Sequence, residues 1–187
     1  MNTYQFLFHN NKVITMFYIN TFLFFSILGW SYETIFHFLE HKMRNNILLG
    51  PWMPIYGFGM LIIEFLNLLL KKLKIKGKKK LIYCFILSVI IITILEELGG
   101  LYIEYFYQTS FWNYEAFPFS IGPYINILVS LIWGLSGLFL EYVIYPLVTP
   151  WLKKIPKWVS ITLLFLLLID NIWSFFNKST ALMWFIS

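Results

Sequence analysis

The chain has 187 residues, of which 59% are hydrophobic, 21% are aromatic and only 12% are charged. Soluble domains carry about 25% charged residues and cannot bury so much apolar surface at this length, so the composition excludes an ordinary soluble fold and predicts a membrane protein. The single cysteine, Cys84, excludes an intramolecular disulfide and a thiol–zinc cluster.

Five apolar stretches are long enough to cross about 30 Å of hydrocarbon as helices. The first stretch follows a basic residue, but it is too long for a cleavable signal peptide and no A-x-A site follows it, so we expect it to remain as a signal anchor. The prediction is an all-α, polytopic membrane protein that forms a single transmembrane domain over residues 1–187. The expected spans lie near residues 13–36, 54–70, 81–103, 121–145 and 158–176.

The basic residues predict the orientation of these helices. Seven lysines lie in the short stretch "KKLKIKGKKK" (71–80) between the second and third spans. With the N-terminus in the cytoplasm, eleven of the fourteen Lys and Arg side chains fall on the cytoplasmic side. Cytoplasmic loops carry such an excess, so we expect the N-terminus inside, the C-terminus outside, and the lysines as a topological anchor rather than a nucleic-acid site.

The acidic residues are distributed differently, because several lie within the apolar spans. Ionisable groups inside a membrane are costly, and they usually mark a polar cavity or path. The alternative is that each carboxyl is protonated and only joins one helix to another by a hydrogen bond. Glu97 and Glu104, seven residues apart, share a helix face, and so do Glu33 and His37. The acids within or at the ends of the spans are Glu33, Glu64, Glu96, Glu97, Glu104, Glu141 and Asp170.

Other chemistry has weaker support in the sequence. Glu33, His37 and His41, spaced by four residues, offer a metal a carboxylate and two imidazoles, but a solvated helix face explains them more simply. There is no G-x-x-x-x-G-K-[ST] phosphate loop and no G-x-S-x-G nucleophile motif, so the chain has no ATPase or hydrolase motif of these kinds. We therefore expect no cofactor and no bound metal.

The stretch "GPWMPIYGFG" (50–59) predicts an irregular Pro/Gly turn before the second helix. Prolines restrict φ and cannot donate a hydrogen bond, whereas glycines allow backbone geometries that other residues avoid. Such a turn could form the lid or floor of an outward-facing pocket near the acids, or it could simply be a helix entry packed by Trp52 and Tyr56. The residues of this turn are Gly50, Pro51, Pro54, Gly57 and Gly59.

Several of these stretches together are similar to one family. They are "GWSYE" (29–33), "LLGPWMPIYGFG" (48–59), Glu96 eight residues before Glu104, "FWNY" (111–114) and a glycine-rich fourth span. This pattern resembles the bacterial ABC-transporter type IV, or CmpB-like, family over about two thirds of the chain. The resemblance implies a polytopic helical membrane protein with a role in transport. The residues that match are Gly29, Glu33, Gly50, Pro51, Pro54, Tyr56, Gly57, Glu96, Glu104, Trp112 and Tyr114.

The chain also departs from the family pattern at polar positions. Arg44 is displaced relative to the Gly-Pro turn, Asn113 replaces an aspartate, and Ser120 and Tyr124 replace an asparagine and an arginine. Ionic partners are therefore missing while the glutamates persist, which argues against a function that depends on salt bridges across the outer loops.

The main functional hypothesis is a small permease or transport subunit in a bacterial inner membrane. We expect an outer-half cavity, with any ATPase on a separate chain and with homo-oligomerisation left open. The alternatives are a membrane-embedded enzyme that acts on a lipid or a lipid-anchored substrate, with Glu33 or Glu96 as acid or base, and a structural or regulatory subunit whose acids only join helices. The cavity candidates are Glu33, His37, Tyr56, Glu64, Glu96, Glu97, Glu104, Trp112 and Tyr114.

Overall fold

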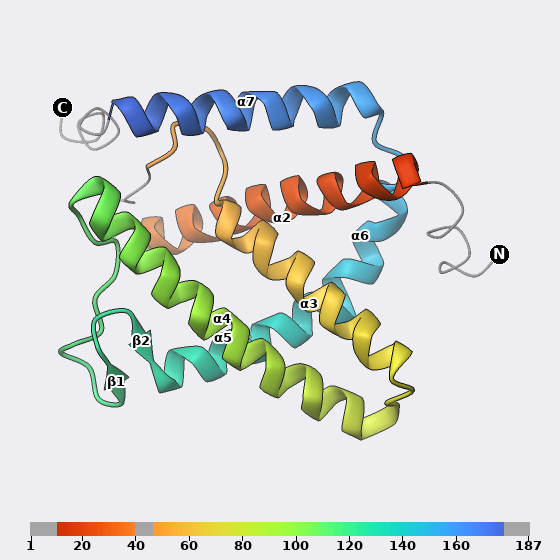
Figure 1. The fold of residues 1–187 in the computed structure, drawn as a ribbon, viewed down its shortest axis with the longest axis horizontal. Coiled ribbons are helices and arrows are strands. Elements are labelled where there is room, and N and C mark those ends of the chain that lie inside the picture. The colour runs from red at the N-terminus through yellow and green to blue at the C-terminus, as the bar shows by residue number, and fades with distance from the viewer. Residues whose placement is uncertain (1–10, 40–46, 178–187) are drawn as a thin grey trace. The chain divides into compact units, whose positions relative to one another are not determined.

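The structure is a computed structural model that describes residues 11–39 and 47–177. Five of its helical segments are long and apolar enough to cross a membrane (Figure 1). The prediction of an all-α membrane protein with about five spanning helices is therefore confirmed. In chain order, the elements are α2 (Asn11–Leu39), α3 (Pro54–Lys72), α4 (Gly77–Tyr107), β1 (Ser120–Ile121), β2 (Ile125–Asn126), α5 (Ile127–Phe139), the π-helix η1 (Leu140–Ile144), α6 (Tyr145–Leu152) and α7 (Lys157–Phe176).

The fourth spanning segment differs most from its expected position. The sequence predicted it near residues 121–145, but the helix runs over Ile127–Leu152 as α5, η1 and α6. It begins late because the residues before it form the two short antiparallel strands β1 and β2. The Asn126 side chain then caps α5 by accepting hydrogen bonds from the backbone N–H groups of Leu128 and Val129, at 3.0 and 3.3 Å.

Helix α4 is longer than expected at both ends. Lysines are good helix formers, so the end of the lysine-rich stretch continues into the helix rather than forming a loop. At the other end, Gln108 adopts a left-handed conformation with φ of 53°, and its N–H donates to the Glu104 carbonyl. This conformation ends the helix in the manner of a left-handed C-cap.

The chain divides into two compact units. The first unit contains the residues up to Phe58 and those from Val148 onward, and the second is Gly59–Leu147. In the first unit, α2 and α7 lie side by side (Figure 1). In the second unit, α4 packs along α5 (Figure 1). The prediction of a single transmembrane domain over residues 1–187 stays a prediction.

Small residues allow α4 and α5 to approach closely. A Cβ atom placed on Gly134 would lie 2.3 Å from Cγ2 of Val89 on α4. Gly137 lies close to α3 as well, because a Cβ there would be 3.0 Å from Cδ1 of Ile63. Close approach through small residues is a common way for helices to associate in lipid, where the hydrophobic effect does not hold them together.

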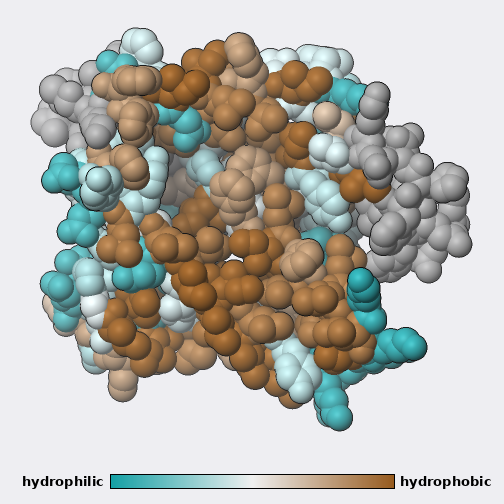
Figure 2. All heavy atoms as spheres, in the orientation of Figure 1, coloured by the Kyte–Doolittle hydropathy of each residue, from teal (hydrophilic) through white to brown (hydrophobic). Residues whose placement is uncertain are grey.

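Large apolar side chains cover much of the surface that Figure 2 shows. Along α4, Ile90, Ile94 and Leu98 recur every four residues and are each about half exposed, at 49%, 51% and 57%. A soluble protein rarely exposes such a continuous apolar surface, whereas a lipid-facing helix requires one. These side chains therefore belong against the hydrocarbon of a bilayer.

Candidate functional site

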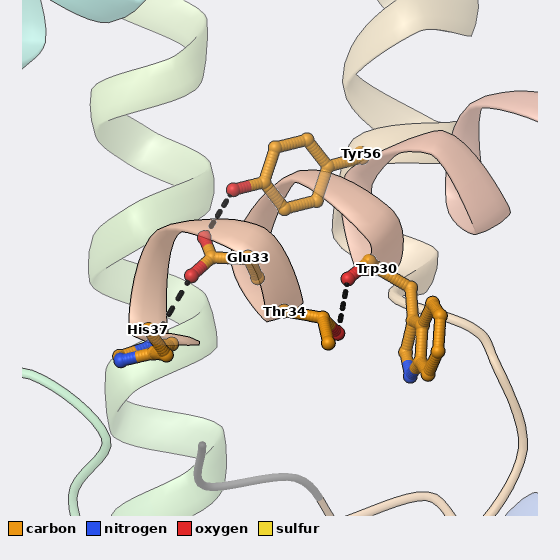
Figure 3. Close-up of polar contacts among 5 residues, drawn as sticks. All are labelled: Trp30, Glu33, Thr34, His37 and Tyr56. Atoms are coloured by element: carbon orange, nitrogen blue, oxygen red, sulfur yellow. Dashed lines mark hydrogen bonds and ion pairs between the residues drawn. The ribbon is translucent and has the colours of Figure 1, made fainter. Parts of the chain in front are cut away.

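Glu33 lies near the end of α2 and contacts two other polar side chains (Figure 3). The Tyr56 hydroxyl donates a hydrogen bond to Oε1 of Glu33. Nε2 of His37, one helical turn further along, lies 3.5 Å from Oε2. Three of the predicted cavity residues, Glu33, His37 and Tyr56, therefore come together within the first unit.

Two glycines explain how Tyr56 reaches Glu33. A Cβ on Gly29 would lie 2.3 Å from Cγ of the Tyr56 ring, so only glycine leaves room for the ring against α2. A Cβ on Gly57 would lie 2.4 Å from the Ser26 hydroxyl, which brings the start of α3 equally close to α2. The hydroxyl–carboxyl contact thus depends on both glycines, and both match the family pattern.

Asp170, on α7, holds the segment that leads into α3. Its Oδ1 accepts hydrogen bonds from the Leu49 N–H at 3.0 Å and from the Ser174 hydroxyl at 3.2 Å. Its Oδ2 accepts from the Gly50 N–H and from the Trp52 indole N–H, each at 2.8 Å. Four donors therefore converge on one buried carboxylate. The sequence placed Asp170 inside a span but supplied no partner for it.

The turn before α3 is shorter than the motif suggested. Gly50 and Pro51 lie in a bend, and Pro54 is the first residue of α3, where the missing N–H of proline costs nothing. Gly57 and Gly59 lie within the helix instead of in the turn. A Cβ on Gly59 would meet no atom within 4 Å, so packing gives no reason for a glycine there.

In the second unit, Glu96 bonds to an indole on the neighbouring helix. Nε1 of Trp133, on α5, donates to Oε1 of Glu96 at 2.9 Å. Oε2 of Glu96 and Oε2 of Glu97 are buried and receive no hydrogen bond from any residue that the structure describes. Trp133 was not predicted as a site residue, and the sequence carries no spacing signal that links it to Glu96.

Glu104 lies at the end of α4 and bonds to the loop that precedes α5. The Tyr124 hydroxyl donates to Oε2 of Glu104 at 2.9 Å, and the Tyr124 ring lies against Gly100, where a Cβ would be 2.3 Å from its Cγ. Burial, together with the nearby Glu104 carboxyl, raises the pKa of the Tyr124 phenol above its ordinary value. The phenol therefore remains a neutral hydrogen-bond donor to Glu104 over the physiological pH range.

Trp112 and Tyr114, the remaining aromatic candidates, support this loop. The Trp112 indole donates to the Tyr124 carbonyl at 3.4 Å, and its ring meets the Tyr124 ring edge-on with centroids 6.1 Å apart. The Tyr114 N–H donates to the Pro123 carbonyl at 2.8 Å. Trp112 therefore holds Tyr124 in position, and Tyr114 holds the neighbouring residue Pro123.

Glu64 belongs to a third polar group, which joins α3 to the π-helix. The Asn67 amide donates one hydrogen bond to Glu64 at 3.4 Å and another to Oε1 of Glu141. The Tyr142 hydroxyl donates to the Asn67 carbonyl oxygen at 3.5 Å. The sequence predicted Glu64 alone, although Asn67 lies three residues further on, which is the spacing that places two residues on one helix face.

The metal candidates are only partly within the structure. Glu33 and His37 are in contact, but His41 lies outside the described residues. Among residues 11–39 and 47–177, no group of three or more His, Cys, Asp or Glu side chains could hold a metal ion.

The predicted carboxyls therefore fall into separate groups. Glu33 lies in the first unit and bonds to Tyr56, whereas the second unit holds Glu96 with Trp133, Glu104 with Tyr124, and Glu64 with Asn67. The expected cavity shared by these carboxyls stays a prediction. Sequence reasoning missed Trp133 and the role of Tyr124, because a hydrogen-bond partner on another helix or in a loop leaves no periodic signal. It also missed Asn67, although its spacing of three residues from Glu64 on α3 could have indicated it.

The comparison with known families agrees with this architecture. The family model described as "Putative ABC-transporter type IV" matches residues 20–176, which include most of α2 and all of α3 to α7. Neither the curated proteins nor the solved structures include one that matches the chain significantly. The match extends beyond residues 29–150, where the sequence motifs had suggested it. With a polytopic helical architecture and a family match over most of its length, the chain belongs to the ABC-transporter type IV family.

Proposed function

We propose that this protein is a small permease or transport subunit whose membrane-embedded carboxyls line the path of its substrate. Family membership supports a role in transport, and the position of the carboxyls within apolar helices supports a polar path. Glu96 and Glu104 belong to the outer part of this path, and Glu64 continues it toward the lysine-rich end of α3 and α4.

The observation that carries the proposal is the kind of partner that these carboxyls have. Glu96 accepts from an indole N–H, Glu104 from a phenol and Glu64 from an amide, and all three donors are uncharged. A neutral donor stabilises a carboxyl in either protonation state, whereas a lysine or arginine would hold it ionised. Carboxyls with such partners can exchange a proton or a cation during transport.

The proposal includes an orientation and a source of energy. The lysines of residues 71–80 lie on the cytoplasmic side of a bacterial inner membrane, with the N-terminus inside and the C-terminus outside. A C-terminal reporter fusion tests this orientation, because a cytoplasmic reporter signal would contradict it. If ATP drives transport, a separate chain supplies the ATPase, which would stimulate transport when both chains are reconstituted together.

Thiol labelling tests whether water reaches the carboxyls. In a Cys84→Ser background, we expect a membrane-impermeant maleimide to label Glu104→Cys and Glu96→Cys from outside. Leu98→Cys is the matched control, because Leu98 lies on the same helix with its side chain 57% exposed among the lipid-facing residues. A failure to label both glutamate positions, in protein that inserts normally, would contradict an outer water-filled path.

Transport itself is tested in cells of the source organism. We expect a deletion strain to change the amount of at least one small solute in the cells or the medium, and Glu96→Gln to reproduce that change at a normal level of inserted protein. Altered lipid species with unchanged solutes would favour the membrane enzyme instead. Normal function after acid-to-amide changes at Glu33, Glu64, Glu96, Glu97 and Glu104 would favour a structural subunit.

A further inference from the structure

The π-helix η1 places a second carboxyl beside Glu64. Residues Leu140–Ile144 form a wide helical turn, which the Tyr145 N–H closes by donating to the Leu140 carbonyl. Pro146 follows and cannot donate a backbone hydrogen bond, and a proline often perturbs the preceding turn in this way. The turn carries Glu141, which is only 3% exposed. Wide turns of this kind occur frequently at functional sites.

The hydrogen bonds of this group are incomplete. Both Asn67 amide hydrogens are used, one for each carboxyl. Oε2 of Glu141 is buried and receives a hydrogen bond from no donor within the described part of the chain. The shared Asn67 amide nevertheless places the Glu64 and Glu141 carboxyls beside each other. A buried oxygen that lacks a donor is costly, and a proton on either carboxyl would supply the missing donor.

We propose that Glu64 and Glu141 form a proton-binding site that holds one exchangeable proton between their carboxyls. In the loaded state, one carboxyl is protonated and donates to the other, which is ionised. In the unloaded state, that O–H bond has broken, the proton has moved to water, and both carboxyls are ionised. This inference rests on the proposed transport function, because it assigns the coupling ion of that function to a particular pair of residues.

The charged and titratable groups around the pair favour a proton over a metal cation. Lys71, on α3, and Lys80, on α4, both act on Glu64 and Glu141, and their positive charges oppose a bound metal cation. The same charges lower the cost of the doubly ionised state, which makes release of the proton feasible. The Asn67 amide presents N–H groups to the carboxyls, and its oxygen already accepts from Tyr142. Cys84, on α4, also faces Glu141 and Tyr142.

Infrared spectroscopy on the purified full-length protein tests the site. We expect a stretching band of a protonated carboxyl that shifts in D₂O and that disappears in both Glu141→Gln and Glu64→Gln. Glu115→Gln is the matched control, because Glu115 is exposed. This variant removes the same charge as the pair variants but leaves Glu64 and Glu141 unchanged. The proposal is overturned if both pair variants give the same carboxyl band as the wild type from mildly acidic to mildly alkaline pH.

A second measurement needs no variant that must fold. Dicyclohexylcarbodiimide is apolar and reacts with protonated carboxyls, so we expect it to modify Glu64 or Glu141 in the wild-type protein, with a yield that falls as the pH rises. Peptide mass mapping identifies the modified residue. If the peptides that contain Glu64 and Glu141 both stay unmodified at every pH, the inference is contradicted. Maleimide labelling of Glu96→Cys and Glu104→Cys is independent of this pair, so the outer path and the proton site can fail separately.

Discussion

Asp170 in the first unit and the Glu64–Glu141 pair in the second are both buried carboxyl sites, but they differ in their hydrogen bonds. Asp170 accepts from two backbone N–H groups, one indole and one hydroxyl. The pair shares a single amide, and one of its oxygens has no donor among the described residues. Both oxygens of Asp170 have donors, whereas one oxygen of the pair lacks a donor that the proposed proton would supply.

This difference separates a structural carboxyl from one that can change its state. The four donors satisfy both oxygens of Asp170, and three of them hold the segment before α3 against α7, which is a structural role. In the proposed proton site, two ionised carboxylates would repel each other, so binding of the proton can respond to pH or to a substrate. The number and type of donors therefore say more about the role of a membrane carboxyl than its depth does.

The largest expected effect comes from Asp170→Ala. It leaves the N–H groups of Leu49 and Gly50 and the Trp52 indole without their acceptor, so we expect a loss of at least about 3 kcal/mol in the free energy of unfolding. Asp170→Asn also destabilises, because its NH₂ group faces donors that need an acceptor. The thermal midpoint in detergent measures both. Asn171→Ala is the control, since Asn171 is exposed and its amide donates to a carbonyl of its own helix. An equal loss for Asn171→Ala would contradict a special role for Asp170.

Asn67→Leu tests the pair in the same assay. The change removes the amide that both carboxyls share, and we expect a loss of about 2 kcal/mol, because leucine of similar size fills the space but supplies no donor. The loss is smaller than for Asp170→Ala because the two carboxyls can still share a proton. A thermal midpoint unchanged from the wild type would show that the shared amide contributes nothing to stability.

Ser174→Ala removes only one of the four donors to Asp170. We expect a loss of about 1 kcal/mol, the ordinary net contribution of a single hydrogen bond, because three donors still stabilise the carboxylate. Ser136→Ala is the matched control, because the Ser136 hydroxyl donates to a carbonyl of its own helix. If Ser174→Ala lowered the free energy of unfolding as much as Asp170→Ala, the contributions of the four hydrogen bonds would not be additive.

Glu141→Gln should have the smallest effect on stability. The glutamine oxygen accepts from Asn67 and its NH₂ group donates to Glu64, as a protonated glutamate would, so we expect a change of about 0.5 kcal/mol or less. The contrast with Asp170→Asn is the sharpest test of the comparison, since both changes replace a carboxyl with an amide of equal size. A large loss for Glu141→Gln would mean that Glu141 is needed as an anion.

The sequence predicted the helices well, because their signal is local. A membrane span needs about 20 apolar residues, and such a run can be read without knowing any neighbour. The late start of α5 was not predicted, although Gly122 and Pro123 are a turn signal. The pairing of residues 120–126 as β1 and β2 is seen only in the structure. The π-helix was also not predicted, since a single wide helical turn does not change the amino-acid composition of the span.

The candidate site was predicted only in part. The sequence located Glu33, Glu64, Glu96 and Glu104, because a charge within an apolar run is conspicuous. It did not identify their partners Trp133 and Tyr124, nor the donors of Asp170. Trp133, Tyr124 and three of the four Asp170 donors lie at least 20 residues away along the chain. Such contacts depend on which helix faces meet.

The sequence by itself determined that this protein crosses a membrane with about five helices and carries acids within them. The physical reason is that hydrocarbon accepts only long apolar helices, and acids stand out against that background. Only the tertiary structure decided which acid has which donors. It gave Asp170 four donors and left Oε2 of Glu141 without a donor from residues 11–39 and 47–177. Hydrogen-bond satisfaction is a property of packed helices and not of any one of them.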